Sequence, residues 1–507
     1  MHLSLRLLSR LAAPALLLCL ALFAPLAVGS AAAAQGRFVP APCWFTPPEG
    51  EAVLCGTVAV PERRDRPSPR TLHLAVAVLR STAAKPAADP VIFIEGGPGA
   101  SPFGFGELGE ERMESWWELS APFRRTRDFV LFDPRGVGRS EPDTNCTELD
   151  GMAGAPRART LTRTVVEAAE RVALEACSAR LRASGIDLAT FTTPAAVDDV
   201  ADIAAALGAT RFNLFAVSYG TRVALDVLRR HGSRVRALVL DAVYPPDVNA
   251  AEEEAWLARR ALRRLFDDCT ANRSCRAAFP NLERRFLDLA ARLDAAPAEV
   301  SVGDPLVPLT VRLDGAALLA AVLEAMAEDE PIPRLPALID RAARGRLERL
   351  AQYVPTSRLG DPDTAEGMAF SIECRETVNA ADPTRTTNNR RRWTVLPGAG
   401  TDEPGKRVCA VWPAGVPEPI ERLPVASTVP ALLFSGAYDP VTPPEWGERA
   451  ARTLPQSRHM VFRASGHVVT AGEPCALDAA AAFIKRPDPA KLPACPAADK
   501  PPMFELR

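Results

Sequence analysis

Ser218 occupies the position that nucleophilic catalysis favours at the edge of a sheet. It lies in residues 215–221, FAVSYGT, between an apolar run that predicts a strand and a segment that predicts a helix. A sharp turn from strand into helix presents the serine Oγ at the carboxyl edge of a sheet, and small neighbours let the backbone turn there. The usual pattern is Gly-x-Ser-x-Gly, and Ala216 replaces its first glycine. The motif predicts a nucleophile, and an ordinary strand-to-helix turn is the alternative.

A nucleophilic serine needs a base, and the sequence offers five histidines. His467 lies in a loop after a predicted strand, at the sheet edge where Ser218 is expected. The other four lie in segments that give them structural roles or remove them with an export signal: His2, His73, His231 and His459. We therefore expect His467 to be the general base.

The third member of such a triad is an acid that fixes the imidazole tautomer and stabilises the imidazolium. Asp439 fits, because it lies in residues 434–442, FSGAYDPVT, after a predicted strand and before His467 in the chain. Asp241, at the end of an earlier predicted strand, is the competing choice. The chain order Ser, Asp, His favours Asp439. Thr442 either orients the Asp439 loop or caps a turn.

The charge that develops on the substrate oxygen during acyl transfer needs hydrogen-bond donors, which form an oxyanion hole. One expected donor is the backbone N–H of Tyr219, directly after the nucleophile. The other is expected from Gly97, in the glycine-rich residues 95–99, EGGPG, because glycines let a backbone approach a substrate closely. A tight turn without a ligand is the alternative. Together with the triad, this loop predicts acyl transfer through a covalent acyl-enzyme.

Alternating strands and helices are expected to position these residues. Apolar runs predict strands at residues 71–80, 91–94, 129–132, 212–217 and 235–240. A helix before the fourth strand begins with Thr193 as its cap and Pro194 in its first turn, and it ends at Gly208. Another helix follows Ser218 over residues 219–230. This alternation predicts an α/β fold with a mostly parallel sheet and helices on both faces.

The alternation breaks after residue 246. Helical stretches such as residues 252–269 and 282–293 follow, and strand-like runs return only at residues 431–434 and 459–462. An inserted helical cap between two parts of one core is the economical interpretation, and a separate C-terminal domain is the alternative. The predicted organisation is an export signal, a first core part, a cap and a second core part at residues 1–36, 37–246, 247–420 and 421–507.

The first 36 residues are typical of an export signal. Arg6 and Arg10 precede an apolar run over residues 11–28, and small residues follow at 29–34. A retained membrane anchor is the alternative, but two prolines interrupt the run. No later segment is apolar enough to span a bilayer. We expect an exported protein, periplasmic or extracellular, without stable membrane insertion after cleavage.

Composition and cysteine content agree with export. The formal net charge of −2 gives no reason to expect nucleic acid or an anionic membrane as partner. Ten cysteines remain once Cys19 leaves with the signal, and an oxidising compartment favours disulfides between them. Their clustering along the chain suggests pairing between neighbours: Cys43 with Cys55, Cys146 with Cys177, Cys269 with Cys275, Cys374 with Cys409, and Cys475 with Cys495. No metal-ligand spacing accompanies them, so we expect neither a metal nor an organic cofactor.

Five segments resemble the proline iminopeptidase and tripeptidyl aminopeptidase family, which has the α/β-hydrolase fold. They are residues 96–99, 133–140, 217–221, 438–442 and 466–467. The resemblance covers nearly all of the chain after the signal and is greatest to the larger secreted bacterial members. It implies that the Ser, Asp and His motifs form the triad. It also implies a helical cap that restricts substrates to short peptides with a free amino terminus, and a bracing role for Asp133 and Arg135.

An exopeptidase must also hold the ammonium group of its substrate. A carboxylate in a partly desolvated cap pocket would do this and would reject blocked peptides. Residues 372–376, IECRE, resemble a Cys-x-Glu segment of secreted relatives, so Glu376 is the first candidate and Glu373 the second. Glu95, beside the predicted oxyanion loop, is the third.

The sequence thus predicts a secreted serine exopeptidase, an aminopeptidase of prolyl or tripeptidyl type, that acts on short peptides. The triad does not encode amide over ester, so an esterase or lipase with the same residues is one alternative. A catalytically silent α/β-hydrolase that serves as a binding module is another. The released group and the oligomeric state are left open.

Overall fold

We analysed a computed structural model of the chain, which describes residues 36–65, 70–105, 108–150, 163–303, 309–355, 364–396 and 404–506. Gln35–Arg507 form one compact unit. The predicted export signal lies outside the described residues, apart from Gly36. No helix in the described part of the chain is long and apolar enough to cross a membrane.

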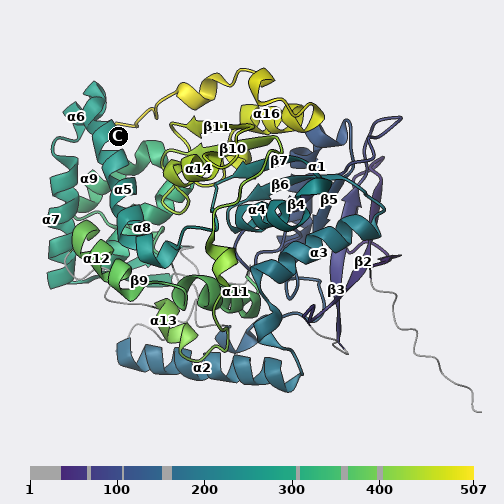
Figure 1. Cartoon of the computed structure of the whole chain (residues 1–507). Helices are drawn as coiled ribbons and strands as arrows, with labels where there is room; N and C mark the ends of the chain where they lie inside the picture. The colour runs from purple at the N-terminus through teal and green to yellow at the C-terminus, as the bar shows by residue number, and fades with distance from the viewer. Residues whose placement is uncertain are drawn as a thin grey trace, which may run out of the picture. The chain divides into compact units, whose positions relative to one another are not determined.

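A nine-stranded sheet forms the centre of the fold (Figure 1), in the order β1-β2-β3-β5-β4-β6-β7-β10-β11. Neighbours from β1 to β5 pair antiparallel, and the six strands from β5 to β11 pair parallel. The predicted, mostly parallel sheet is therefore confirmed. The strand bounds are β1 Phe38–Pro40, β2 Val53–Pro61, β3 Thr71–Leu79, β4 Val91–Ile94, β5 Phe129–Phe132, β6 Phe212–Val217, β7 Val235–Asp241, β10 Ala431–Gly436 and β11 Ser457–Phe462.

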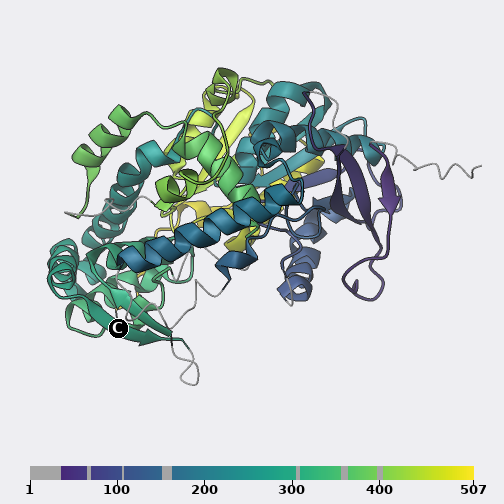
Figure 2. The same ribbon diagram turned by 90° about the horizontal axis from the view of Figure 1, so that it is seen from below.

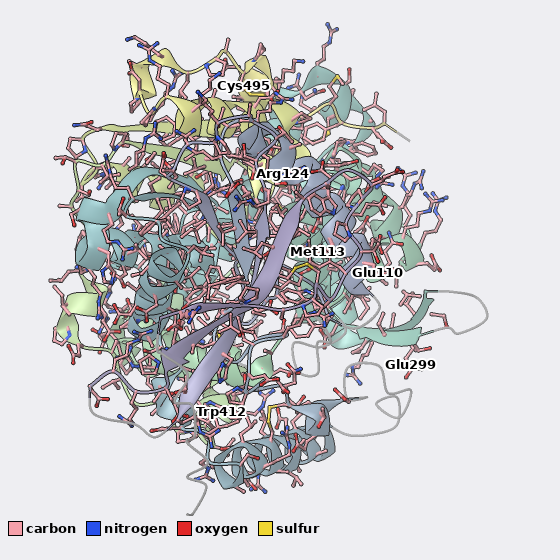
Figure 3. All side chains as sticks on the ribbon, turned by 90° about the vertical axis from the view of Figure 1, so that its right-hand side faces the viewer. Glu110, Met113, Arg124, Glu299, Trp412 and Cys495 are labelled. Carbon is pink, nitrogen blue, oxygen red and sulfur yellow. A yellow bond between two sulfur atoms is a disulfide. The ribbon has the colours of Figure 1, made fainter. Side chains whose placement is uncertain are left out.

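Helices cover both faces of the sheet, which explains why the central strands are apolar throughout. Every residue of β4, β5 and β6 is buried. Figure 3 labels Trp412 and Cys495, which belong to the apolar clusters on opposite faces. The helices are α3 (Thr193–Ala206), α4 (Tyr219–His231) and α14 (Pro444–Ala451) on one face, and α1 (Leu108–Arg124) and α16 (Pro474–Lys485) on the other.

The start of α3 differs from the prediction by one residue. Thr192 has an extended backbone and its hydroxyl accepts the Ala195 N–H, so Thr192 is the cap and Thr193 is the first helical residue. In the sequence, either of the two adjacent threonines is a plausible cap, and only the backbone conformation distinguishes them. The change matters because it leaves the Thr193 side chain free for a contact with the cap.

Residues 247–420, which we call the cap, lie between β7 and β10. An apolar cluster of their own holds α5, α7, α8 and α9 together and includes Tyr438 of the core. The described cap also contains an antiparallel pair, β8 and β9, that the helical prediction did not include. The bounds are α5 Ala250–Ala271, α6 Arg273–Ala278, α7 Leu282–Ala295, β8 Ala298–Val302, β9 Leu309–Leu313, α8 Gly315–Ala327, α9 Leu335–Ala343, α10 Glu348–Ala351, α11 Glu366–Ile372, the π-helix η6 Glu373–Val378, α12 Pro383–Trp393, α13 Pro404–Cys409 and the 3-10 helix η7 Pro419–Arg422.

A long helix outside the predicted cap also packs against it. This helix, α2 (Arg163–Ala183), precedes α3 in the chain and lies alongside α11 and α13 (Figures 1 and 2). Leu174 and Leu181 of α2 share an apolar cluster with Met368 and Phe370 of α11. We call α2 and the cap together the covering structure. It therefore consists of two separate segments of the chain.

The five predicted cysteine couples are each joined by a disulfide. Three of them lie in the covering structure: Cys146–Cys177 ties a 3-10 turn to α2, Cys269–Cys275 ties α5 to α6, and Cys374–Cys409 ties η6 to α13. Most of the bridges therefore fasten helices outside the central sheet.

Candidate active site

Ser218, His467 and Asp439 form a continuous chain of hydrogen bonds. The Oγ of Ser218 lies 2.9 Å from Nε2 of His467, and Nδ1 of His467 lies 2.8 Å from Oδ2 of Asp439. In this arrangement an imidazole can take the serine proton while the carboxylate holds the ring in one tautomer. The fold thus brings together three predicted residues that lie far apart in the sequence.

The turn at Ser218 exposes its side chain by means of an unusual backbone conformation. Ser218 links β6 to α4 with φ 52° and ψ −128°, which a non-glycine residue rarely adopts. A Cβ on Gly220 would collide with the carbonyl oxygens of Ile94 and Glu95, so α4 can pack against the end of β4 only with glycine there. Ala216 lies within β6 at an ordinary strand conformation, which explains why a methyl group fits.

Asp439 is completely buried, and hydrogen bonds saturate its carboxylate. Oδ1 accepts the backbone N–H groups of Val441 and Thr442 at 2.7 and 2.9 Å, and Oδ2 accepts the Thr442 hydroxyl at 2.7 Å. Burial alone would raise the pKa of Asp439, but His467 and these hydrogen bonds outweigh it and hold that pKa below its usual value. Asp439 is therefore ionised at neutral pH.

Asp241, the competing acid, has a different set of partners. Its buried carboxylate accepts the backbone N–H groups of Val469 and Thr470 at 3.1 and 2.7 Å and the Thr470 hydroxyl at 2.7 Å. Its carbonyl oxygen accepts the Ser218 N–H at 2.9 Å. Asp241 thus fastens the loop that follows His467 to the backbone of Ser218.

The cap holds the His467 loop from the other side. The backbone N–H of His467 donates to the carbonyl of Ala327, the last residue of α8, at 2.7 Å, and Gly466 donates to Asp329 at 2.6 Å. Burial alone would lower the pKa of His467, but Asp439 outweighs it, Asp241 and Glu328 add to the effect, and the pKa is raised. The cap therefore contributes to the position of His467 and, through Glu328, to the raised pKa of its imidazole.

The glycine-rich loop after β4 lies directly against Ser218. A Cβ on Gly96 would lie 2.9 Å from Cβ of Ser218, and Gly97 has φ 99°, which favours glycine. The loop also touches the cap, because the Gly99 carbonyl accepts the Ala365 N–H at 2.9 Å. Tyr219 opens α4, so its N–H lies in the first turn, where a helix supplies no acceptor. Tyr219 directly follows Ser218 in the chain, and Gly97 follows Gly96, the residue that lies against Ser218.

Asp133 and Arg135 make bracing contacts of the kind that the resemblance implied. One Asp133 oxygen accepts the Ser101 hydroxyl at 2.5 Å, and the other accepts the Arg139 N–H at 2.6 Å. Burial raises the pKa of Asp133 to about 7 despite these hydrogen bonds. Arg135, also buried, forms a two-pronged pair with Asp199 at 2.7 and 2.8 Å. The oxyanion loop is thereby tied to the end of β5.

Glu376 lies in the π-helix η6 and is almost completely buried. Its Oε1 accepts the Thr193 N–H at 2.9 Å, and its Oε2 accepts the Thr193 hydroxyl at 2.6 Å. Arg222 and Arg375 lie 3.6 and 3.4 Å from the carboxylate. The Thr193 hydroxyl also lies 2.7 Å from the hydroxyl of Tyr219. The charge of Glu376 is therefore already balanced within the protein.

The other two candidate carboxylates have different surroundings. Glu95 accepts its neighbour's backbone N–H at Gly96 and pairs with Arg112 at 3.0 Å, and Arg112 is half exposed. Glu373 is exposed on η6. Of the three candidates, Glu95 is nearest in the chain to the loop that contacts Ser218.

Four residues of the site were not predicted from the sequence. Thr193 and Arg222 contact Glu376, and their sequence segments gave only helix signals. Glu328 and Asp329 follow α8 at the His467 loop, and nothing in the local sequence distinguishes them from other solvent-facing acids. Contacts between distant segments create these roles, so a linear pattern carries no signal for them. In the described part of the chain, no group of three or more potential ligands is arranged to hold a metal ion.

The model of the alpha/beta hydrolase fold family matches residues 89–474. The chain therefore belongs to the alpha/beta hydrolase fold family.

Named relatives include two peptidases. A tripeptidyl aminopeptidase of Streptomyces lividans is 30% identical over 207 residues, which span 40% of this chain and 37% of that protein. The serine protease Hip1 of Mycobacterium tuberculosis is 24% identical over 475 residues, which span 87% of this chain and 88% of that protein. Among solved structures, a proline iminopeptidase from Mycobacterium smegmatis matches with 17% identity, 86% and 99% coverage of the two chains and a TM-score of 0.37.

Proposed function

We propose that this protein is an exported serine exopeptidase that removes a short amino-terminal group from peptides through an acyl-enzyme. The observation that carries the proposal is the hydrogen-bonded chain from Ser218 through His467 to the ionised Asp439. The names of two relatives, a tripeptidyl aminopeptidase and a serine protease, support peptides as the substrate class.

In the proposed reaction, His467 takes the Ser218 proton as the Oγ attacks the scissile carbonyl. The backbone N–H groups of Tyr219 and Gly97 receive the charge on the carbonyl oxygen. The intermediate collapses, the C–N bond breaks, and His467 gives the proton to the leaving amine. Water, activated in turn by His467, then hydrolyses the ester and regenerates the free Ser218 hydroxyl. Asp439 stabilises the imidazolium in both halves of the cycle.

The contacts rank the carboxylates that could hold the substrate ammonium. Glu95 ranks first, because it pairs with the half-exposed Arg112 and adjoins the oxyanion loop. Glu328 is an addition from the structure, since it is exposed beside the His467 loop. Glu376 follows, because Arg222 already lies next to its carboxylate, and exposed Glu373 comes last. Loss of discrimination against N-acylated peptides in Glu95→Gln or Glu328→Gln would identify the ligand.

Export is the second part of the proposal. Five disulfides support an oxidising compartment, because cytosolic thiols are kept reduced. The test is fractionation of a cell culture with an antibody to the protein: the mature chain is expected in the periplasm or medium, shortened near residue 36. A full-length chain in the cytoplasm would refute export.

A panel of aminoacyl, dipeptidyl and tripeptidyl anilides tests the peptidase proposal. The purified protein is expected to hydrolyse free-amino-terminal anilides and to leave their N-acylated versions intact. Ser218→Ala should abolish the activity and retain the fold by circular dichroism. The length of the preferred substrate will show whether one residue or several are released.

Two outcomes would favour the alternatives. Turnover of simple p-nitrophenyl esters with failure on every peptide would indicate an esterase. Absence of Ser218-dependent labelling by a fluorophosphonate probe, in protein that is folded, would indicate a silent binding module.

A further inference from the structure

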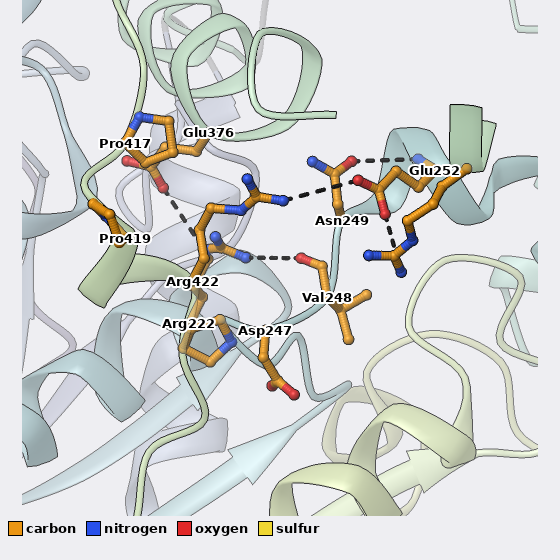
Figure 4. A pocket seen from close by; sticks show the side chains of 11 residues that line it. Arg222, Asp247, Val248, Asn249, Glu252, Glu376, Pro417, Pro419 and Arg422 are labelled. Carbon is orange, nitrogen blue, oxygen red and sulfur yellow. Dashed lines mark hydrogen bonds and ion pairs between the residues drawn. The ribbon is translucent and has the colours of Figure 1, made fainter. Parts of the chain in front are cut away.

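A cavity lies apart from the triad, between α4 and the cap (Figure 4). Its volume is about 350 Å³, and its walls include Arg222 of α4, Glu376 of η6 and Arg422 at the end of η7. The triad residues do not line it. The volume is that of a small-molecule site.

The carboxylates in the cavity wall already have partners. Glu376 is held by Thr193 at both oxygens. Glu252 accepts a backbone N–H at 2.8 Å and pairs with Arg385 at 3.1 Å. Asp247 pairs with Arg449 at 2.5 Å. The acceptors of the cavity are therefore satisfied by the protein itself.

Two arginines in the same wall have donors that the protein does not use. Arg222 is 3% exposed; its Nη1 donates to the carbonyls of Pro245 and Val248 at 3.5 and 3.3 Å, its Nε lies 3.6 Å from Glu376, and its guanidinium lies 5.0 Å from the centre of the Tyr244 ring. Arg422 approaches Glu252 only to 3.9 Å. Among the described residues, nothing accepts a hydrogen bond from Nη2 of Arg222 or from Arg422. Figure 4 shows both side chains in the cavity wall.

We propose that this cavity binds a carboxylate, which Arg222 and Arg422 hold between them. A guanidinium presents paired donors that match the two oxygens of a carboxylate. The wall contains three arginines and three carboxylates, so its formal charges balance. A singly charged ligand therefore suits the cavity better than a doubly charged phosphate, because the second charge would lose its hydration in a wall that carries no net positive charge.

The carboxylate has two possible sources, the carboxyl terminus of a short peptide and a free carboxylic acid. The walls of the cavity come from the core and from the cap, so a bound carboxylate would tie the core and the cap together through charged hydrogen bonds. Binding should therefore raise the temperature of thermal unfolding as ligand concentration rises. The site does not depend on the proposed peptidase reaction, and it can be tested in protein that cannot hydrolyse peptides.

Calorimetric titration of the Ser218→Ala protein tests the proposal with three probes: N-acetyl-L-alanine, trialanine and trialanine amide. Both carboxylates are expected to bind with saturable heat, and the amide at least tenfold more weakly than trialanine. Arg422→Gln should weaken both carboxylates at least tenfold. Arg452→Gln, which removes the same charge from an exposed residue at the end of α14, should change neither affinity. If trialanine binds more tightly than N-acetyl-L-alanine, the carboxyl terminus of a peptide is the source of the carboxylate. If the two affinities are equal, a free carboxylic acid is the source.

Several results would overturn the proposal. They are absence of saturable binding of either carboxylate, equal affinity for trialanine and its amide, unchanged carboxylate affinity in Arg422→Gln, or inorganic phosphate binding more tightly than N-acetyl-L-alanine. Because the side chain of Arg422 is 42% exposed, its replacement should leave the fold intact, and circular dichroism of the variant checks this.

Discussion

Thr193 and Glu376 connect the nucleophile turn to the cap through a hydrogen bond of 2.6 Å between the hydroxyl and Oε2. The same hydroxyl lies 2.7 Å from the Tyr219 hydroxyl, and Tyr219 follows Ser218 directly. Burial raises the pKa of Glu376, although Arg222 and Thr193 oppose it. A buried carboxylate of the cap thus fixes the residue whose N–H is the proposed oxyanion donor.

Glu376→Gln should lower kcat about tenfold and leave KM for free-amino-terminal peptides nearly unchanged. The amide keeps the size of the side chain but places an N–H₂ group where Thr193 needs an acceptor, which loosens the link to Tyr219. Steady-state kinetics on the anilide panel measures both parameters. Glu324→Gln, at an exposed position on α8, serves as the control. A rise in KM confined to free-amino-terminal substrates, with kcat intact, would instead assign Glu376 to the substrate ammonium.

Thr442→Val should reduce kcat/KM about tenfold, because Oδ2 of Asp439 loses a hydroxyl donor in a fully buried site. Thr442→Ser retains that hydroxyl and is expected to keep most of the activity. Comparison of the two variants separates the hydrogen bond from the packing of the methyl group. Equal losses in both would show that the hydroxyl is unimportant.

Asp241→Asn should destabilise the fold by about 2 kcal/mol, because its two oxygens accept three hydrogen bonds and an amide cannot accept at both positions. Asp439→Asn should instead reduce kcat by roughly 10³–10⁴-fold, through the wrong imidazole tautomer. Urea unfolding and kinetics on both variants make the comparison. If Asp241→Asn were as stable as the parent but as inactive as Asp439→Asn, Asp241 would be the triad acid.

The pH dependence of kcat/KM should have an acid limb above pH 6.5. The base must be neutral to accept the serine proton, and Asp439 raises the pKa of His467 above its usual value even though burial opposes this. Removing the negative charge of Glu328 disfavours the imidazolium, so Glu328→Gln should shift this limb to lower pH. Glu324→Gln, also exposed on α8, is the control. A shift to higher pH in Glu328→Gln would contradict the proposed electrostatics.

Replacing Cys374 and Cys409 together by serine should lower the free energy of unfolding by about 3–4 kcal/mol, since the bridge closes a loop of 35 residues. The bridge between Cys269 and Cys275 closes a loop of only 6 residues, and its removal should cost about 2 kcal/mol. Denaturant unfolding under non-reducing conditions compares the two. The reverse order of costs would show that chain entropy is not the main contribution.

Local patterns predicted most of the central fold. The strand at residues 91–94 and that at 212–217 have the predicted bounds, because a continuous apolar run between turn residues specifies a buried strand. The helix α2 has no counterpart among the elements predicted from the sequence. The hairpin of β8 and β9 lies within a segment that the sequence pattern led us to interpret as helical. The predicted cap of α3 was Thr193, but Thr192 is the cap, because a threonine at either position can cap a helix.

By itself, the sequence determined the α/β alternation and the residues Ser218, Asp439 and His467 as candidates, because each depends on patterns within short segments, and it suggested the disulfide couples without fixing their connectivity. The tertiary structure alone decided which side chains meet. Asp241 and Asp439 both follow parallel strands, and only packing directs one to the backbone of Val469 and the other to the imidazole. The contacts of Glu376 and the meeting of Arg222 with Arg422 in the cavity between α4 and the cap likewise arise where distant segments pack together. Spacing along the chain does not encode such contacts.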